Sequence, residues 1–204
     1  MIQSFRDWRL LLGFILAFLL VHFTFQYINV FWYIYTATAL FLIAYSIMNE
    51  ESEDSLPVHK YLLLGIGTGF GIYLIFWVGH FFLQAIQFSH AVAQVEYLYW
   101  KIAPKDIIHY ILLILILVPG EEFFWRGFIQ KRLLRYSSFW QSIILTSILN
   151  ASVYLFTSLY TLLIAALISG LVWGWLYAKY RSLPLAIISH LTFDLTMFLF
   201  LPLY

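Results

Sequence analysis

The sequence predicts an all-α protein, a polytopic membrane bundle of about seven transmembrane helices with a cytoplasmic N-terminus. Of its 204 residues, 63% are hydrophobic and 10% are charged, whereas soluble domains average about 25% charged residues. The chain also contains apolar runs that approach or exceed the roughly 20 residues that a helix needs to cross a bilayer. Composition and run length together indicate an integral membrane protein in contact with membrane lipid.

The apolar runs define the helices in chain order. The first run follows Arg6 and Arg9, and because no small-x-small cleavage site ends it, we expect a retained helix and not a removed signal peptide. The predicted spans are 8–26, 29–48, 61–86, 107–130, 138–157, 159–178 and 183–203. We divide the chain into N-terminal helices with an interfacial segment (1–106) and core helices that carry the polar motifs (107–204).

Two connections are more polar than the spans. The first, 49–60, contains four acidic residues and Pro57, which predicts a loop outside the membrane. The second, 88–106, mixes His90, Gln94 and Glu96 with aromatic residues, which is typical of a helix lying on the bilayer surface.

Orientation follows from the basic residues of the connections. With the N-terminus inside, the outer connections hold only Lys101 and Lys105. The inner segments hold Arg6, Arg9, Lys60, Lys131, Arg132, Arg135, Lys179 and Arg181. Because lysine and arginine concentrate on the cytoplasmic side, we predict that the N-terminus is inside and the C-terminus outside.

Two glycine pairs have the four-residue spacing that lets transmembrane helices approach closely. They are Gly67 with Gly71 and Gly170 with Gly174. The glycines of 65–71 superficially resemble a nucleotide loop, but the preceding strand that such a loop requires is missing. We therefore predict helix packing at both pairs.

Several chemistries are excluded by what the chain lacks. It has no cysteine, so disulfides, thiol catalysis and cysteine-ligated metals are impossible. The net charge is +1 and no basic run is present, so nothing indicates a nucleic-acid partner. No cofactor is expected.

The most informative polar residues follow the apolar run 107–118. They are Glu121, Glu122 and Arg126, and a charge near the bilayer centre costs about 2.5–3.5 kcal/mol even on the mildest scale. Residues four apart share a helix face, so Glu122 can pair with Arg126. Glu121 lies about 100° around the helix without a partner in its own turn. This pattern predicts one structural carboxylate and one carboxylate free for chemistry.

The last span carries a second polar pair, His190 and Asp194, which also share a helix face. Counting about 1.5 Å per residue from the predicted helix ends places this pair at the depth of Glu121, in the cytoplasmic half of the membrane. The two sets of polar residues are therefore expected to meet in one site.

Buried carboxylates and a histidine suit acid–base chemistry. A carboxylate can act as a general base for water, and polar groups opposite it can hold an oxyanion. Hydrolysis of a peptide or ester bond in a cavity open to the cytoplasm fits these parts. A transporter would use such residues as a proton relay, but no internal repeat is evident. A metal held by Glu121 and His190 is a further alternative, although the chain has no HExxH pattern.

The spacing Glu121-Glu122-x-x-x-Arg126, followed by His190-x-x-x-Asp194, resembles the CPBP family. This family of intramembrane proteases includes the Rce1-type CAAX prenyl endopeptidases and bacterial Abi-domain proteins. The lead-in from Gly174 to His190 is similar to the family's last motif. The resemblance implies that Glu121 activates water, that Glu122 and Arg126 support it, and that His190 and Asp194 stabilise the oxyanion.

The chain departs from the family's middle motif, Phe-x-x-x-His. Asn150 stands where phenylalanine is expected, and Tyr154 stands where histidine is expected. A tyrosine can donate a hydrogen bond, but it does not exchange a proton near neutral pH as an imidazole does. Two hypotheses follow: Glu121 works with Tyr154 or Asn150 as an intramembrane endopeptidase on a peptide or membrane protein, or the chain is an inactive scaffold. A scaffold would regulate a partner such as a cell-envelope hydrolase, and for either we expect a bacterial cell membrane.

Overall fold

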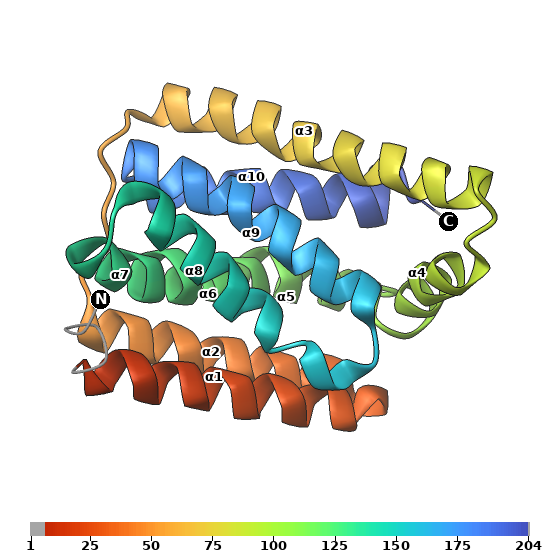
Figure 1. The fold of residues 1–204 in the computed structure, drawn as a ribbon, viewed down its shortest axis with the longest axis horizontal. Coiled ribbons are helices and arrows are strands. Elements are labelled where there is room, and N and C mark those ends of the chain that lie inside the picture. Colours follow the sequence, from red (N-terminus) through yellow and green to blue (C-terminus); the bar gives the residue numbers. More distant parts are fainter. Residues whose placement is uncertain (1–6, 204) are drawn as a thin grey trace.

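The computed structural model describes residues 7–203, and within them it is a bundle of helices with no β-strand. Seven helical stretches are long and apolar enough to cross a membrane. They lie roughly side by side, so the two ends of the bundle form opposite faces (Figure 1). The chain is thus an integral, multi-pass membrane protein, as predicted.

The observed spans agree closely with the predicted ones. They are α1 (Trp8–Gln26), η2 with α2 (Ile28–Val30 and Phe31–Asn49), α3 (Val58–Ala85), a rod over Ile107–Tyr136, α8 with η5 (Phe139–Ser152 and Leu155–Thr157), α9 (Tyr160–Tyr180) and α10 with η6 (Leu183–Leu195 and Thr196–Phe200). Between α3 and the rod, α4 (Ser89–Lys101) forms the predicted short helix at one end of the bundle (Figure 1). Helices from before and after residue 106 pack together, α3 against α10 above all.

The rod extends six residues beyond the predicted end at Gln130. The basic residues after it suggested a membrane boundary, but Arg132 is buried because acidic groups surround it. Its Nη1 lies 2.6 Å from a carboxylate oxygen of Asp7 in α1's N-terminal cap, and its Nε lies 2.8 Å from Glu50. Lys131 reaches Glu53, 3.2 Å away. Ion pairing therefore lets the helix continue and ties the loop 50–57 to the rod.

The prediction that Gly67 and Gly71 pack against another helix is wrong, because these two glycines lie on the outer face of α3. A Cβ at Gly67 or Gly71 would meet no atom within 4 Å. Gly65 and Gly69 are the buried glycines, and they let α3 approach α10 closely: a Cβ at Gly69 would lie 2.7 Å from Thr192 Cβ and also against the Ser189 carbonyl. The other pair is confirmed, since Gly170 and Gly174 face α8 at contact distance.

We expect Gly69→Ala to lower the thermal stability of the purified protein. The added methyl group meets backbone of α10 that cannot rotate away, and such overpacking costs about 1–3 kcal/mol. Gly71→Ala is the matched control, because it adds the same methyl group to open space two residues further along α3. Equal melting temperatures for the two variants would contradict the close contact between α3 and α10.

Candidate active site

The long helix over Ile107–Tyr136, which carries both glutamates, switches locally from α-helical to π-helical hydrogen bonding. It runs through α5 (Ile107–Leu112), the π-helical turn η3 (Leu113–Leu117), α6 (Val118–Glu122), the π-helical η4 (Phe123–Gln130) and α7 (Lys131–Tyr136). Pro119 has no N–H to donate to the preceding turn and its ring crowds the carbonyl there, so a wider π turn precedes it. Such turns are often found at functional sites. Here they lie on both sides of Glu121 and Glu122.

The predicted ion pair is present and completely buried. Arg126 Nε lies 3.2 Å from Glu122 Oε2, and the two side chains are 1% and 0% exposed. The other oxygen of Glu122 lies 2.8 Å from Nδ1 of His190 on α10. Glu122 therefore joins the two predicted motifs, with both of its oxygens engaged, and it is a structural rather than a free carboxylate.

The His190 ring is also held from its other sides. Its Nε2 lies 3.7 Å from Asp194 Oδ2. The indole of Trp173 on α9 stacks on it, with ring centroids 3.8 Å apart, and Arg126 lies over the same indole. The Trp173 Nε1 donates to Ser189 Oγ. Sequence reasoning did not single out Trp173, whose only signal was its place directly before Gly174.

Glu121 has a different partner, which the sequence did not reveal. The hydroxyl of Tyr35 on α2 donates a hydrogen bond to Glu121 Oε1. The approach is possible because the neighbouring Gly120 has no side chain: a Cβ there would lie 2.9 Å from the Cβ of Ala39, one turn along α2 from Tyr35. Within residues 7–203 no other hydrogen bond to this carboxylate is seen.

Tyr154 lies beside this pair. It lines the same cavity as Tyr35 and Glu121, and Phe25 meets its ring edge-on, with the ring centroids 5.7 Å apart. Asn150, one turn earlier on α8, is 3% exposed, and its Oδ1 has no hydrogen-bond partner among the described residues. The two residues of the altered middle motif thus line the same cavity as Glu121, His190 and Asp194.

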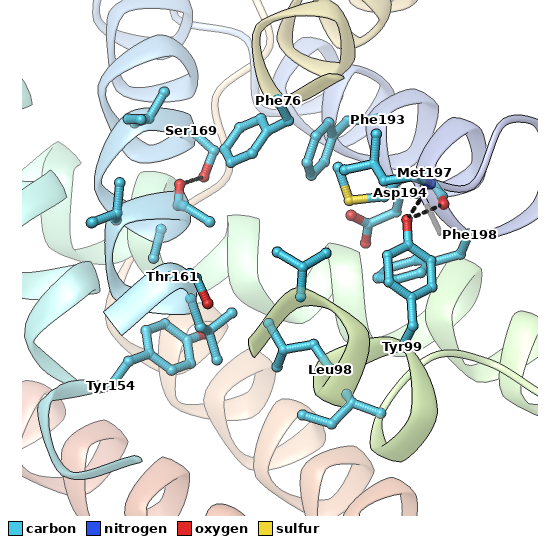
Figure 2. Close-up of a pocket in the computed structure, with 18 of the residues that line it drawn as sticks. Phe76, Leu98, Tyr99, Tyr154, Thr161, Ser169, Phe193, Asp194, Met197 and Phe198 are labelled. Carbon is cyan, nitrogen blue, oxygen red and sulfur yellow. Dashed lines mark hydrogen bonds between the residues drawn. The ribbon is translucent and has the colours of Figure 1, made fainter. Parts of the chain in front are cut away.

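These residues line a single cavity of about 540 Å³. Its wall is mostly aromatic and aliphatic, and the residues described above that line it include Tyr35, Glu121, Asn150, Tyr154, Trp173, His190 and Asp194. Figure 2 shows Asp194 and Tyr99 on one side of the cavity and Tyr154 with Thr161 on the other. A space of this size, apolar with few polar groups, is typical of a binding site.

The position of the cavity within the bundle is defined by the helices that line it. Glu121 lies near the midpoint of the 30-residue rod and not in the half near its C-terminal end. From Glu121 the cavity extends toward α4, reaching Ile102 and Pro104. That end is opposite the one where the basic residues of α7 pair with acidic groups of the loop 50–57 and of the α1 cap (Figure 1). The cavity therefore extends from Glu121 away from the basic end of the bundle. The assignment of that basic end to the cytoplasm stays a prediction.

A metal site at Glu121 and His190 is not supported by the arrangement of side chains in the described part of the chain. Across residues 7–203, no three His, Asp or Glu side chains are arranged to hold an ion. His190 already uses Nδ1 toward Glu122 and faces Asp194 with Nε2. We derive no step through a metal.

Comparison with known proteins agrees with the motifs. The family model of type II CAAX prenyl endopeptidases, Rce1-like, matches residues 103–196, the segment from just before the rod to the last turn of α10. No curated protein and no solved structure matches the chain. The resemblance to the CPBP family of Rce1 type is confirmed over residues 103–196.

Proposed function

We propose that the protein is an intramembrane endopeptidase that hydrolyses a peptide bond of a membrane-associated substrate, with Glu121 as the general base. The observation that supports this proposal is that the two neighbouring glutamates have different surroundings. Glu122 is committed to Arg126 and His190, whereas Glu121 faces the cavity with a single hydroxyl donor on one oxygen. The family match supports a membrane endopeptidase of the CAAX-protease type.

The reaction follows from this arrangement. Glu121 takes a proton from a water while the water oxygen bonds to the carbonyl carbon of the substrate. The hydroxyl of Tyr154 and the amide of Asn150 line the same cavity and are donors for the oxyanion that forms. The carbon–nitrogen bond then breaks as Glu121 returns the proton to the leaving nitrogen. In this scheme, Tyr154 orients and stabilises but does not transfer the proton.

An inactive scaffold is the second candidate, and one observation favours it. Among the described residues the hydrogen bond to Glu121 comes from Tyr35 and not from an imidazole, and Tyr154 stands where the family's middle motif has its histidine. Such a chain would bind and regulate a partner protein, for example a cell-envelope hydrolase in a bacterial membrane.

The experiment that separates the two is a comparison of native membranes with and without the protein. Mass spectrometry of peptide termini reports which chains are cut. The proposal predicts that at least one membrane peptide persists uncut when the protein is absent and is cut again when the protein is restored. Unchanged termini, together with a partner that co-purifies with the protein, would instead support the scaffold.

A further prediction concerns Tyr35. Tyr35→Phe removes the hydrogen bond to Glu121, and a hydrogen bond to a charged group contributes about 1.5–3 kcal/mol. Since each 1.4 kcal/mol is about tenfold in rate, we expect kcat to fall roughly tenfold to a hundredfold with little change in KM. Tyr33→Phe is the control, because Tyr33 lies two residues away on α2 with its side chain exposed. Equal kcat values for the two variants would show that Tyr35 does not position the base.

A further inference from the structure

The cavity is a wedge between two helices. At one end α3 and α9 belong to one hydrophobic cluster, to which α3 contributes Ile72 and Tyr73 and α9 contributes Trp173 and Leu176. From that contact the two helices diverge toward α4, as Figure 1 shows. The cavity lies in the diverging part, where residues 75–83 of α3 face residues 160–169 of α9.

The wide end of this wedge is closed by α4. Gln94 of α4 donates to the carbonyl of Ser158 and accepts from the amide and the hydroxyl of Thr161, at 3.0–3.1 Å. Tyr99 donates to the carbonyl of Met197 at 2.7 Å and accepts from the amide of Leu203. Burial raises the pKa of Tyr99 to about 12, so the donor persists at physiological pH. A substrate that entered along the helix axis would have to break these bonds.

Between α3 and α9, on the side of the bundle that faces lipid, the cavity is bordered by residues that also reach the outer surface. Ile75 and Phe82 of α3 and Ile164 of α9 line the cavity and are also 51%, 58% and 48% exposed on the outer surface of the bundle. Gly79 lies between the two α3 residues, lines the cavity as well, and has open space where a side chain would stand. In a membrane these positions face acyl chains, so the opening is lateral and apolar.

The charge distribution says in which half of the membrane this opening lies. The end occupied by α4 carries Lys101 and Lys105. The opposite end carries all the other described basic residues except the buried Arg126, namely Arg9, Lys60, Lys131, Arg132, Arg135, Lys179 and Arg181. Because the basic side of a membrane protein faces the cytoplasm, the opening is in the half away from it.

We propose that an apolar, membrane-anchored peptide segment enters the cavity sideways, between α3 and α9, from the non-cytoplasmic half of the bilayer. This inference rests on the proposed function for the choice of a peptide. It assigns to Ile75, Gly79, Phe82 and Ile164 the role of a lateral opening, and to α4 that of the fixed end wall. The substrate chemistry is that of a hydrophobic anchor whose scissile bond reaches Glu121 at mid-membrane.

The chain has no cysteine, so a maleimide labels only a cysteine that is introduced by substitution. The labelling measures access of the reagent to that position and does not depend on peptidase activity. Ser169→Cys places a thiol on the cavity wall, where an N-alkyl maleimide dissolved in the bilayer should react with it. We expect Gly79→Trp to abolish most of this labelling by filling the opening, and Gly71→Trp, whose site lies outside the cavity wall, to leave it unchanged. Equal labelling in both tryptophan variants would overturn the lateral opening.

The side of the membrane is tested in the same way. Ser89→Cys marks the start of α4 and Ser52→Cys marks the loop at the basic end, and both serines are exposed. An impermeant maleimide added to intact cells should label Ser89→Cys, and should label Ser52→Cys only after the cells are opened. The reverse pattern would overturn the proposed side. Neither assay uses cleavage, so a failure of the proposed peptidase activity would show separately, as unchanged peptide termini.

Discussion

Glu121→Gln is expected to abolish cleavage while leaving the fold intact. The amide keeps the shape of the side chain and can still accept the hydrogen bond of Tyr35, but it cannot take a proton from water. General base catalysis contributes about 10²–10⁴-fold, and we expect kcat to fall by that factor. The measurement is the rate at which purified variants in lipid cut the peptide that persists in membranes lacking the protein.

A matched control keeps this result specific. Glu51→Gln makes the same chemical change at an exposed carboxylate in the loop 50–57, far from the cavity. Melting temperatures of the two variants should agree with that of the natural protein, since neither change alters a buried ion pair. If the Glu121→Gln and Glu51→Gln variants cleave the peptide at the same rate, Glu121 is not the general base.

Arg126→Ala is expected to destabilise the protein more than any other substitution considered. It leaves the Glu122 carboxylate buried without its cation, and removing one partner of a buried pair costs about 3–5 kcal/mol. It also vacates the space over Trp173. We expect the variant to accumulate poorly in membranes, and any extracted protein to melt at a much lower temperature.

Two variants show whether the pair is the cause. Arg135→Ala removes an arginine that is 47% exposed and pairs with Glu50 at the end of the rod. Glu50 keeps Lys131 and Arg132 as partners, so we expect a loss close to that of an exposed pair, about 0–1 kcal/mol. The double variant Arg126→Met with Glu122→Gln removes both buried charges together, so it should accumulate better than Arg126→Ala. If the double variant is as unstable as the single one, lost packing and not the stranded charge explains the defect.

The helices could be predicted because each span is a long apolar run with polar residues at its ends. The Glu122–Arg126 pair could be predicted because four-residue spacing within one helix fixes which side chains meet. That His190 lies near the glutamate pair followed from their common depth, although the carboxylate it contacts is Glu122 and not Glu121, the one compared with it by depth. The rod's true end was missed because Arg132 owes its burial to Asp7, 125 residues away in the chain.

What could not be predicted depends on how one helix lies against another. Tyr35 reaches Glu121 only because Gly120 lets α2 approach the rod, and no spacing within a helix reports that register. The same limit explains the glycines of α3, where a spacing of four fits both Gly67 with Gly71 and Gly65 with Gly69, and only the packed structure selects the second pair.

The most direct test of the central claim, that Glu121 activates water for peptide hydrolysis, is cleavage in ¹⁸O-labelled water. The purified protein and its uncut peptide are incubated in lipid, and the new carboxyl terminus is weighed by mass spectrometry. Our account predicts one ¹⁸O atom in the carboxylate formed by the natural protein, and no product with Glu121→Gln. Labelled product from both proteins, or intact peptide that remains bound to both, would contradict it.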